Sequence, residues 1–201
     1  MPNINTLQFN KLIDSGDNLF VIQCSGGLGN NIGGFFSGLD YYIKFELNKS
    51  HKLVVVSVAD DSGDFILSGI NGSFDAVVMN PPYLRNEDLS ASDKDSWLNQ
   101  IEANIGKESF IRSASQPNHY YYFIEMAVAK LSEDGTGAFI LMSKFLNNKD
   151  GFPLKKYLTP YLEAVIHYPP SFFEGFHVTT DIFILKNKNQ ASEKISFLNV
   201  K

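Results

Sequence analysis

The residues with the clearest chemical potential are four consecutive ones, Asn80-Pro81-Pro82-Tyr83. They directly follow residues 74–79, a short apolar run that predicts a buried strand. In an open parallel sheet, ligands bind beyond the carboxyl ends of the strands, so the tetrapeptide lies where chemistry is expected. An ordinary proline-rich turn explains the same four residues, and on the tetrapeptide alone both interpretations stay open.

The types of these residues suit the positioning of a planar nitrogen group. The side-chain oxygen of Asn80 and the backbone carbonyl of Pro81 are two acceptors that could hold the two hydrogens of an amide or ring amine. Such a grip localises a lone pair that is otherwise delocalised, which is electrostatic preorganisation rather than general-base catalysis. Pro82 adds no N–H that would compete for these acceptors. Tyr83 offers a ring face for stacking, so loss of its hydroxyl alone is expected to matter little.

The elements that must position these residues alternate between strand and helix. Near-continuous apolar runs predict strands covered on both faces, at residues 19–22, 52–58, 74–79, 137–142, 164–168 and 181–185. Helical spacing predicts a helix over residues 120–131 that is ended by Gly135, and a short helix over 154–158. This order predicts an α/β fold with a doubly wound, mainly parallel sheet, and the last two runs predict an antiparallel hairpin at one edge.

Residues 86–118 differ from the rest of the chain, because they are polar and rich in Ser, Asp and Asn. A segment of this length within a compact domain is usually functional or mobile. We expect it to be a mobile segment on the substrate side that orders when a substrate or partner closes over Tyr83.

Residues 74–83 resemble the catalytic motif of amino-methyltransferases that use S-adenosylmethionine. They are most similar to the N6-adenine DNA methyltransferases of restriction-modification systems. Related motifs occur in RNA base methyltransferases and in the glutamine methyltransferases of release factors, so three substrate classes stay open. The resemblance implies a single Rossmann-like class I methyltransferase domain over residues 1–201. It also implies S-adenosyl-L-methionine as the cofactor and a flipped adenine as the methyl acceptor. The implied catalytic residues are Asn80, Pro81, Pro82 and Tyr83.

Two further segments resemble cofactor-binding motifs of this family. In residues 63–66, Asp64 would accept from the cofactor's adenine amine and Phe65 would pack on the ring. In residues 36–40, Asp40 would accept from the ribose hydroxyls. A turn residue at Asp64 and a helix N-cap at Asp40 are the structural alternatives.

The glycine-rich loop of the family aligns with residues 21–30, where glycines allow the backbone to approach a cofactor closely. The resemblance makes Gln23, Gly27 and Gly29 cofactor-binding candidates. The family usually has an acid where Gln23 stands and a proline where Cys24 stands. Gln23 can accept a hydrogen bond but carries no charge. A degenerate, non-catalytic methyltransferase-like module therefore stays an alternative.

Residues 172–182 resemble a late motif whose aromatic residue contacts the flipped base opposite the catalytic tyrosine. Phe173 is the matched position and a substrate-binding candidate together with Tyr83. The alternative is that Phe173 packs in the predicted hairpin.

Composition limits the partners. The chain has 201 residues, a net charge of −5 and one cysteine, which fits a single domain without an internal disulfide or a multi-cysteine metal site. No metal is expected, and neither a membrane span nor a secretory signal is evident, so we expect a cytoplasmic protein. Because phosphate contacts need Lys and Arg, this acidic chain should bind DNA weakly on its own. We expect a target-recognition domain or subunit to supply the basic surface.

Overall fold

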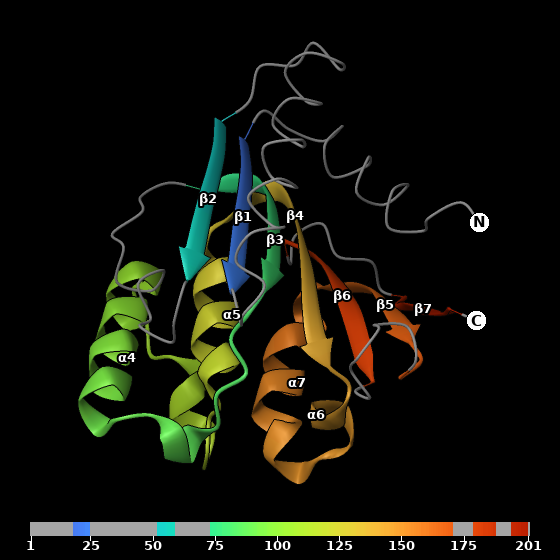
Figure 1. Cartoon of the computed structure of the whole chain (residues 1–201). Coiled ribbons are helices and arrows are strands. Elements are labelled where there is room, and N and C mark those ends of the chain that lie inside the picture. The colour runs from blue at the N-terminus through green and yellow to red at the C-terminus, as the bar shows by residue number, and fades with distance from the viewer. Residues whose placement is uncertain (1–17, 25–51, 59–72, 171–178, 188–193, 201) are drawn as a thin grey trace.

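The computed structural model describes residues 18–24, 52–58, 73–170, 179–187 and 194–200 (Figure 1). Seven strands in this part of the chain form one sheet in the order β2-β1-β3-β4-β6-β5-β7. The strands are β1 (Asn18–Cys24), β2 (Lys52–Val58), β3 (Phe74–Asn80), β4 (Leu131–Met142), β5 (Leu162–Tyr168), β6 (Thr180–Lys186) and β7 (Ser196–Asn199).

The pairing of these strands confirms a mainly parallel sheet. Strands β2, β1, β3 and β4 run parallel to one another, whereas β6 is antiparallel to both of its neighbours, β4 and β5. The predicted hairpin of β5 and β6 therefore exists, but its place at the edge was wrong, because β7 pairs in parallel with β5 beyond it. All four residues of β7 are exposed, so no buried apolar run marks this strand in the sequence.

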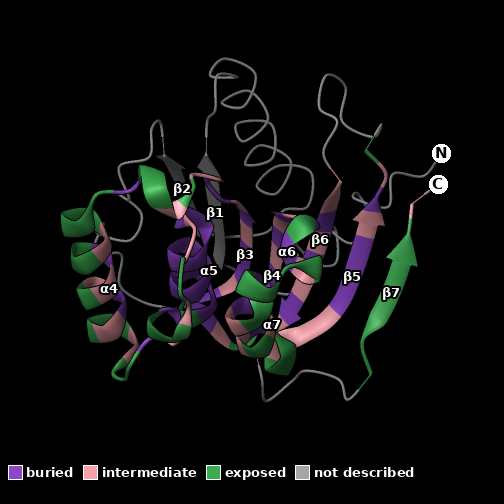
Figure 2. Ribbon diagram, turned by 90° about the horizontal axis from the view of Figure 1, so that it is seen from below, coloured by how far each residue is buried: buried purple, intermediate pink, exposed green. Residues whose placement is uncertain are grey.

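The described helices lie on one side of the sheet (Figure 2). They are α4 (Ala91–Ile105), α5 (His119–Ala129), α6 (Lys144–Asn147) and α7 (Phe152–Leu158), with short 3-10 turns η2 (Asn86–Asp88), η3 (Phe110–Ser113), η4 (Lys149–Gly151) and η5 (Thr159–Tyr161). Helix α5 is buried along almost its whole length, because it has the sheet on one side and α4 on the other. This position explains why most of its residues are apolar or aromatic, with His119 and Glu125 as buried exceptions.

The boundary between α5 and β4 differs from the prediction. The helix ends at Ala129, and Gly135 lies inside β4 rather than at the helix end. Leu131 pairs with Phe74 and Thr136 pairs with Ala76, so β4 bulges between these two pairs. A Cβ atom on Gly135 would lie 2.9 Å from the carbonyl oxygen of Phe74, so this bulge requires glycine.

Most of the polar segment 86–118 forms helix α4 and the turns η2 and η3, which the sequence analysis did not predict. Helix α4 begins after Ser90, whose hydroxyl oxygen accepts a hydrogen bond from the N–H of Asp93, and ends at Gly106 with φ 65°. Only Trp97 and Ile101 of this helix are fully buried, so its apolar stripe is narrow. Whether the segment moves when a substrate binds stays a prediction.

Candidate active site

The tetrapeptide lies where the sequence placed it, at the carboxyl end of a central strand. Asn80 is the last residue of β3, which has β1 on one side and β4 on the other. Pro81 and Pro82 are buried, whereas Asn80 and Tyr83 are half-buried. The prolines thus fix the backbone, and the side chains of Asn80 and Tyr83 lie at the carboxyl end of the central strand.

The side chain of Tyr83 connects the ends of two strands. Its hydroxyl oxygen lies 2.5 Å from the carbonyl oxygen of Ile140 in β4 and 3.2 Å from Oδ1 of Asn80 in β3. Its ring centroid lies 6.0 Å from that of Tyr120 at the start of α5. Tyr83 is therefore fixed at both its hydroxyl end and its ring.

The loop after the tetrapeptide is attached to the N-terminus of α5. The N–H of His119 donates to the carbonyl oxygen of Leu84 at 3.1 Å, and the N–H of Asn86 donates to Oδ1 of Asn118 at 3.0 Å. Residues far apart in the sequence thus meet beside Tyr83.

A pocket of about 460 Å³ opens at this place. Aromatic and amide side chains predominate in its lining, which suits a planar polar ligand. The lining residues are Tyr83, Arg85, Asn86, Glu87, Gln116, Asn118, Tyr120, Tyr121, Met142, Lys144, Phe145, Asn148, Asp150 and Gly151. Of these residues, only Tyr83 was predicted individually, whereas Asn86, Glu87, Gln116 and Asn118 lie in the segment 86–118 that was expected on the substrate side. Their shared position could have indicated them, because α5 begins and β4 ends at the same end of the sheet as Asn80.

Two cationic side chains, Arg85 and Lys144, line the pocket, and they differ in their surroundings. The guanidinium of Arg85 pairs with Glu87 at 2.5 Å and with Asp88 at 3.1 Å, so carboxylates neutralise its charge. Lys144 is exposed at the start of α6 and also lines the pocket. Lys144 is therefore the better placed of these two cations to meet an anionic ligand.

The cofactor candidates are only partly within the described residues. Gln23 of β1 is the register partner of Asn80, so the backbone of the first candidate lies directly beside the tetrapeptide. This neighbourhood could not be read from the sequence, because it depends on which strands pair. The candidates outside the described residues are Gly27, Gly29, Asp40, Asp64, Phe65 and Phe173.

His119 is part of the core rather than an acid–base group. It is fully buried, with its ring stacked on Trp97 at a centroid distance of 4.4 Å and edge-on to Phe123 at 5.0 Å. Burial lowers the pKa of His119 to about 4. The ring is therefore neutral at pH 7 and packs in the core between α4 and α5.

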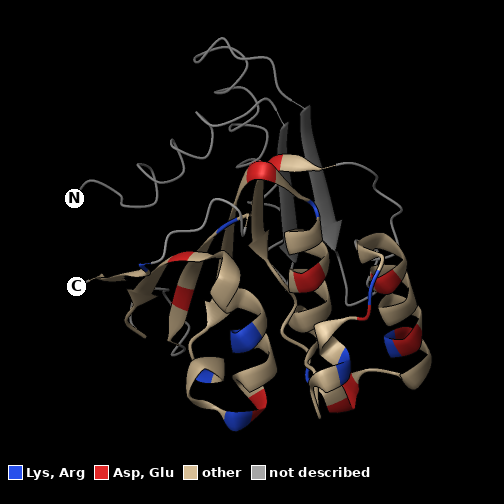
Figure 3. Ribbon diagram, turned by 180° about the vertical axis from the view of Figure 1, so that it is seen from behind, with Lys and Arg blue, Asp and Glu red and all other residues tan. Residues whose placement is uncertain are grey.

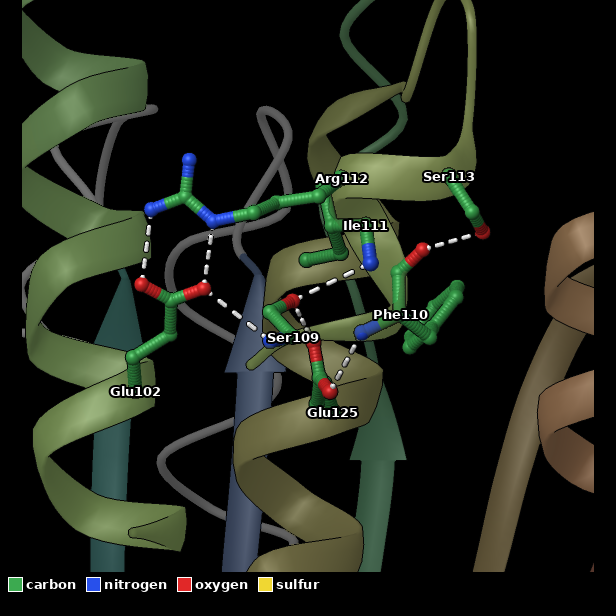
Figure 4. A network of polar contacts seen from close by, with 7 residues as sticks. All are labelled: Glu102, Ser109, Phe110, Ile111, Arg112, Ser113 and Glu125. Carbon is green, nitrogen blue, oxygen red and sulfur yellow. Dashed lines mark hydrogen bonds and ion pairs between the residues drawn. The ribbon is translucent and has the colours of Figure 1, made fainter. Parts of the chain in front are cut away.

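A network of polar contacts holds the segment before α5 in place (Figure 4). The buried carboxylate of Glu125 accepts from the Ser109 hydroxyl and, at 3.1 Å, from the N–H of Phe110. Glu102 of α4 accepts from Nε and Nη2 of Arg112 at 2.6 and 2.7 Å, and these bonds help lower the pKa of Glu102 to about 2. These bonds join η3 to both α4 and α5, which gives them a structural role.

Metal-binding clusters and membrane spans are both absent from the described part of the chain. Within it, no group of three His, Cys, Asp or Glu side chains could hold a metal ion. No helix among these residues is both long and apolar enough to span a membrane.

Solved structures with the same fold place the chain in a class. A crystal structure described as a class I S-adenosylmethionine-dependent methyltransferase from Listeria monocytogenes matches 98% of this chain and 63% of its own, with a TM-score of 0.66 and 15% identity. The methyltransferase subunit of a type I restriction-modification system from Streptococcus thermophilus matches 97% of this chain and 44% of its own, with a TM-score of 0.63 and 18% identity. The fold is that of the class I methyltransferases.

The family follows from the sequence match. The model of the Eco57I restriction-modification methylase family matches residues 3–173, and the chain belongs to this family. Type II methyltransferase M.AccI from Acinetobacter calcoaceticus is 28% identical over 141 residues, which are 68% of this chain and 25% of the relative. Type II restriction enzyme and methyltransferase RM.Eco57I from Escherichia coli is 30% identical over 134 residues, 65% of this chain and 13% of the relative. The chain thus spans a quarter or less of the length of these curated relatives.

Proposed function

We propose that this chain is a catalytic domain that transfers a methyl group from S-adenosyl-L-methionine to the N6 amine of a flipped adenine in DNA, in the cytoplasm and as part of a restriction-modification system. The observation that carries the proposal is the position of Asn80. It ends β3 beside the carboxyl end of β1, where Gln23 is its register partner. A methyl acceptor held by Asn80 and a cofactor held at the end of β1 would then be neighbours. Membership of the family and the class I fold support the same chemistry.

The chain's own residues account for activation of the amine. The N6 lone pair of adenine is delocalised into the ring, which makes the nitrogen a weak nucleophile. The carboxamide oxygen of Asn80 and the carbonyl of Pro81 would accept from its two hydrogens and localise the lone pair toward the incoming methyl group. No general base is needed, because the methylated ammonium is acidic and loses its proton afterwards.

Of the proposed cofactor-binding residues, Gln23 is the one whose backbone the structure describes, and it pairs in register with Asn80. When bound, S-adenosyl-L-methionine supplies a methyl group on a positively charged sulfur, and the C–S bond breaks as the N–C bond forms. Gln23 would contribute an uncharged acceptor near the cofactor's amino acid portion. Roles for Gly27, Gly29, Asp40, Asp64 and Phe65 are part of this proposal through the family resemblance.

The pocket beside Tyr83 supports a planar acceptor. Tyr83 and Tyr120 present aromatic rings, and Asn86 and Asn118 contribute amide groups. The ring of Tyr83 would stack on the extruded base, with Phe173 as the proposed second aromatic contact. Because the curated relatives are much longer, we further propose that a target-recognition domain or subunit reads the DNA sequence.

The test separates cofactor binding from methyl transfer. Calorimetry with S-adenosyl-L-methionine should show binding, and the melting temperature should rise with ligand concentration by mass action. Labelled methyl transfer is then measured to duplex DNA, to RNA and to a glutamine-containing peptide. Transfer to adenine in DNA supports the proposal, whereas transfer only to RNA or peptide assigns another substrate class. No binding at millimolar cofactor would favour the degenerate module.

A further inference from the structure

Among the described residues, two oxygens that accept hydrogen bonds lie close to the hydroxyl of Tyr83. The carbonyl oxygen of Ile140 is 2.5 Å away, and Oδ1 of Asn80 is 3.2 Å away. A phenol carries one hydrogen, so it can donate to only one of them. The shorter distance and the obligatory acceptor character of a backbone carbonyl assign that hydrogen to Ile140.

The contact between Tyr83 and Asn80 then needs its hydrogen from Asn80. The carboxamide of asparagine has an oxygen and an NH₂ group of nearly the same shape, and which end points where is decided by the hydrogen-bond network. If the amide is turned by 180°, its N–H donates to the hydroxyl oxygen of Tyr83. Both contacts of Tyr83 are then satisfied, and the carboxamide oxygen of Asn80 points away from Tyr83.

Under the proposed function, the orientation of this carboxamide decides whether Asn80 can act. Asn80 can accept from a substrate amine only if its oxygen, and not its NH₂ group, faces that amine. A free asparagine side chain would sample both orientations. We propose that the hydroxyl of Tyr83, held by the carbonyl of Ile140, is a positioning group that fixes the carboxamide of Asn80 with its oxygen toward the methyl acceptor. This inference rests on the proposed function.

The inference replaces the expectation that only the ring of Tyr83 matters. Ile140 lies in β4 and Asn80 at the end of β3, so the hydroxyl bridges two neighbouring strands. A bridge of this kind is rigid, because both strands are anchored in the sheet. The ring would still stack on the substrate, while the hydroxyl sets the direction of the acceptor.

A double-mutant cycle tests this role. The four proteins are the full chain, Tyr83→Phe, Asn80→Asp and the double variant, each assayed for methyl transfer with whatever recognition partner it needs. Tyr83→Phe should lower kcat about fivefold, the factor that one neutral hydrogen bond commonly contributes, with KM for DNA little changed because the ring remains. In the Asn80→Asp background the same substitution should cost less than about twofold, because a carboxylate has an oxygen at both positions. Equal losses in the two backgrounds, or no loss of kcat in Tyr83→Phe, would overturn the inference.

A second measurement does not depend on activity. In ¹⁵N-labelled protein, the side-chain NH₂ signals of Asn80 are assigned by their loss in Asn80→Ala. In the native chain these two protons should be well separated and exchange slowly with water, and Tyr83→Phe should bring them to the values of a free carboxamide. Tyr121→Phe is the matched control, because its hydroxyl donates to the carbonyl of Asp150 at 3.0 Å and should leave the Asn80 signals unchanged. Unchanged signals in Tyr83→Phe would overturn the inference. Absence of methyl transfer in all four proteins would instead count against the proposed function.

Discussion

At the scale of single residues, the proposed activity rests on one carboxamide, that of Asn80. Asn80 is half-buried at the end of β3, where its oxygen would accept from the substrate amine. Asn80→Ala should reduce kcat on the order of a hundredfold or more, because it removes a positioned electrostatic partner of the transition state. Cofactor affinity, measured by calorimetry, should stay nearly unchanged. Asn99→Ala, on the exposed face of α4, is the matched control. Near-native turnover of Asn80→Ala would contradict the role assigned to it.

A second residue-scale prediction concerns His119 and pH. The pKa of His119 is about 4 in the folded chain against an ordinary 6.5, so below pH 6.5 the unfolded chain takes up a proton that the folded chain does not. The contribution of His119 to the free energy of unfolding is fully present above about pH 6.5. It decreases by a total of about 3 kcal/mol as the pH is lowered to about 4.

His119→Phe keeps an aromatic ring against Trp97 and removes this titration. Urea unfolding followed by the fluorescence of Trp97, the single tryptophan of the chain, measures the free energy of unfolding at pH 7.5 and pH 5. The native chain should lose about 2 kcal/mol between these values, and the variant clearly less. The same loss in both proteins would mean that other groups cause the acid sensitivity.

At the scale of elements, the sequence was most informative where it contains short, continuous apolar runs. The runs at β1 to β6 were all recognised as strands. Helix α4 was not predicted because most of its residues are polar. Only two of them, Trp97 and Ile101, are fully buried, so its apolar face is narrow. The cap at Ser90 and the glycine at 106 would have indicated its two ends.

In the candidate site, too, some features could be predicted from the sequence and others could not. The tetrapeptide 80–83 is contiguous in sequence and could be recognised as a unit. The bridge from Tyr83 to Ile140 joins positions 57 residues apart, and the pairing of Gln23 with Asn80 depends on strand order. Neither contact follows from spacing along the chain, because both are set by which strands become neighbours.

A prediction at this scale concerns the attachment of η3 to α5. Glu125→Ala removes the partner of the Ser109 hydroxyl and of the Phe110 N–H, and should lower the free energy of unfolding by about 3 kcal/mol. Glu125→Gln should cost less, because burial raises the pKa of this carboxyl group and so favours a neutral side chain at the position. Urea unfolding measures both, with the exposed Glu133→Ala as control. Equal stability of the alanine variant and the native chain would exclude this anchoring role.

At the scale of the whole molecule, the net charge is acidic, but the charged side chains of the described residues are unevenly distributed (Figure 3). Helix α4 carries three acidic residues and one lysine. The stretch from α6 to α7 carries four lysines and one aspartate, namely Lys144, Lys149, Lys155, Lys156 and Asp150. Lys155 donates to the carbonyl of Leu146, and the other three lysines are exposed. This stretch forms one wall of the pocket beside Tyr83, so it is the described surface best suited to face a phosphate backbone near the substrate.

The last prediction follows from this asymmetry. The isolated chain should bind duplex DNA weakly and with little sequence preference at physiological salt, since few basic residues can contact phosphates. The binding that exists should depend on Lys144, Lys149 and Lys156. Replacing all three by alanine should reduce the slope of log affinity against log salt by about 1 for each phosphate that the variant no longer neutralises, whatever the DNA sequence. Lys107→Ala, which lies on the η3 side of the molecule, is the control and should leave the slope unchanged. Fluorescence anisotropy over a salt series measures these slopes. An unchanged slope in the triple variant would mean that other residues bind the phosphates, and tight, sequence-specific binding by the native chain would mean that base recognition is built into this domain.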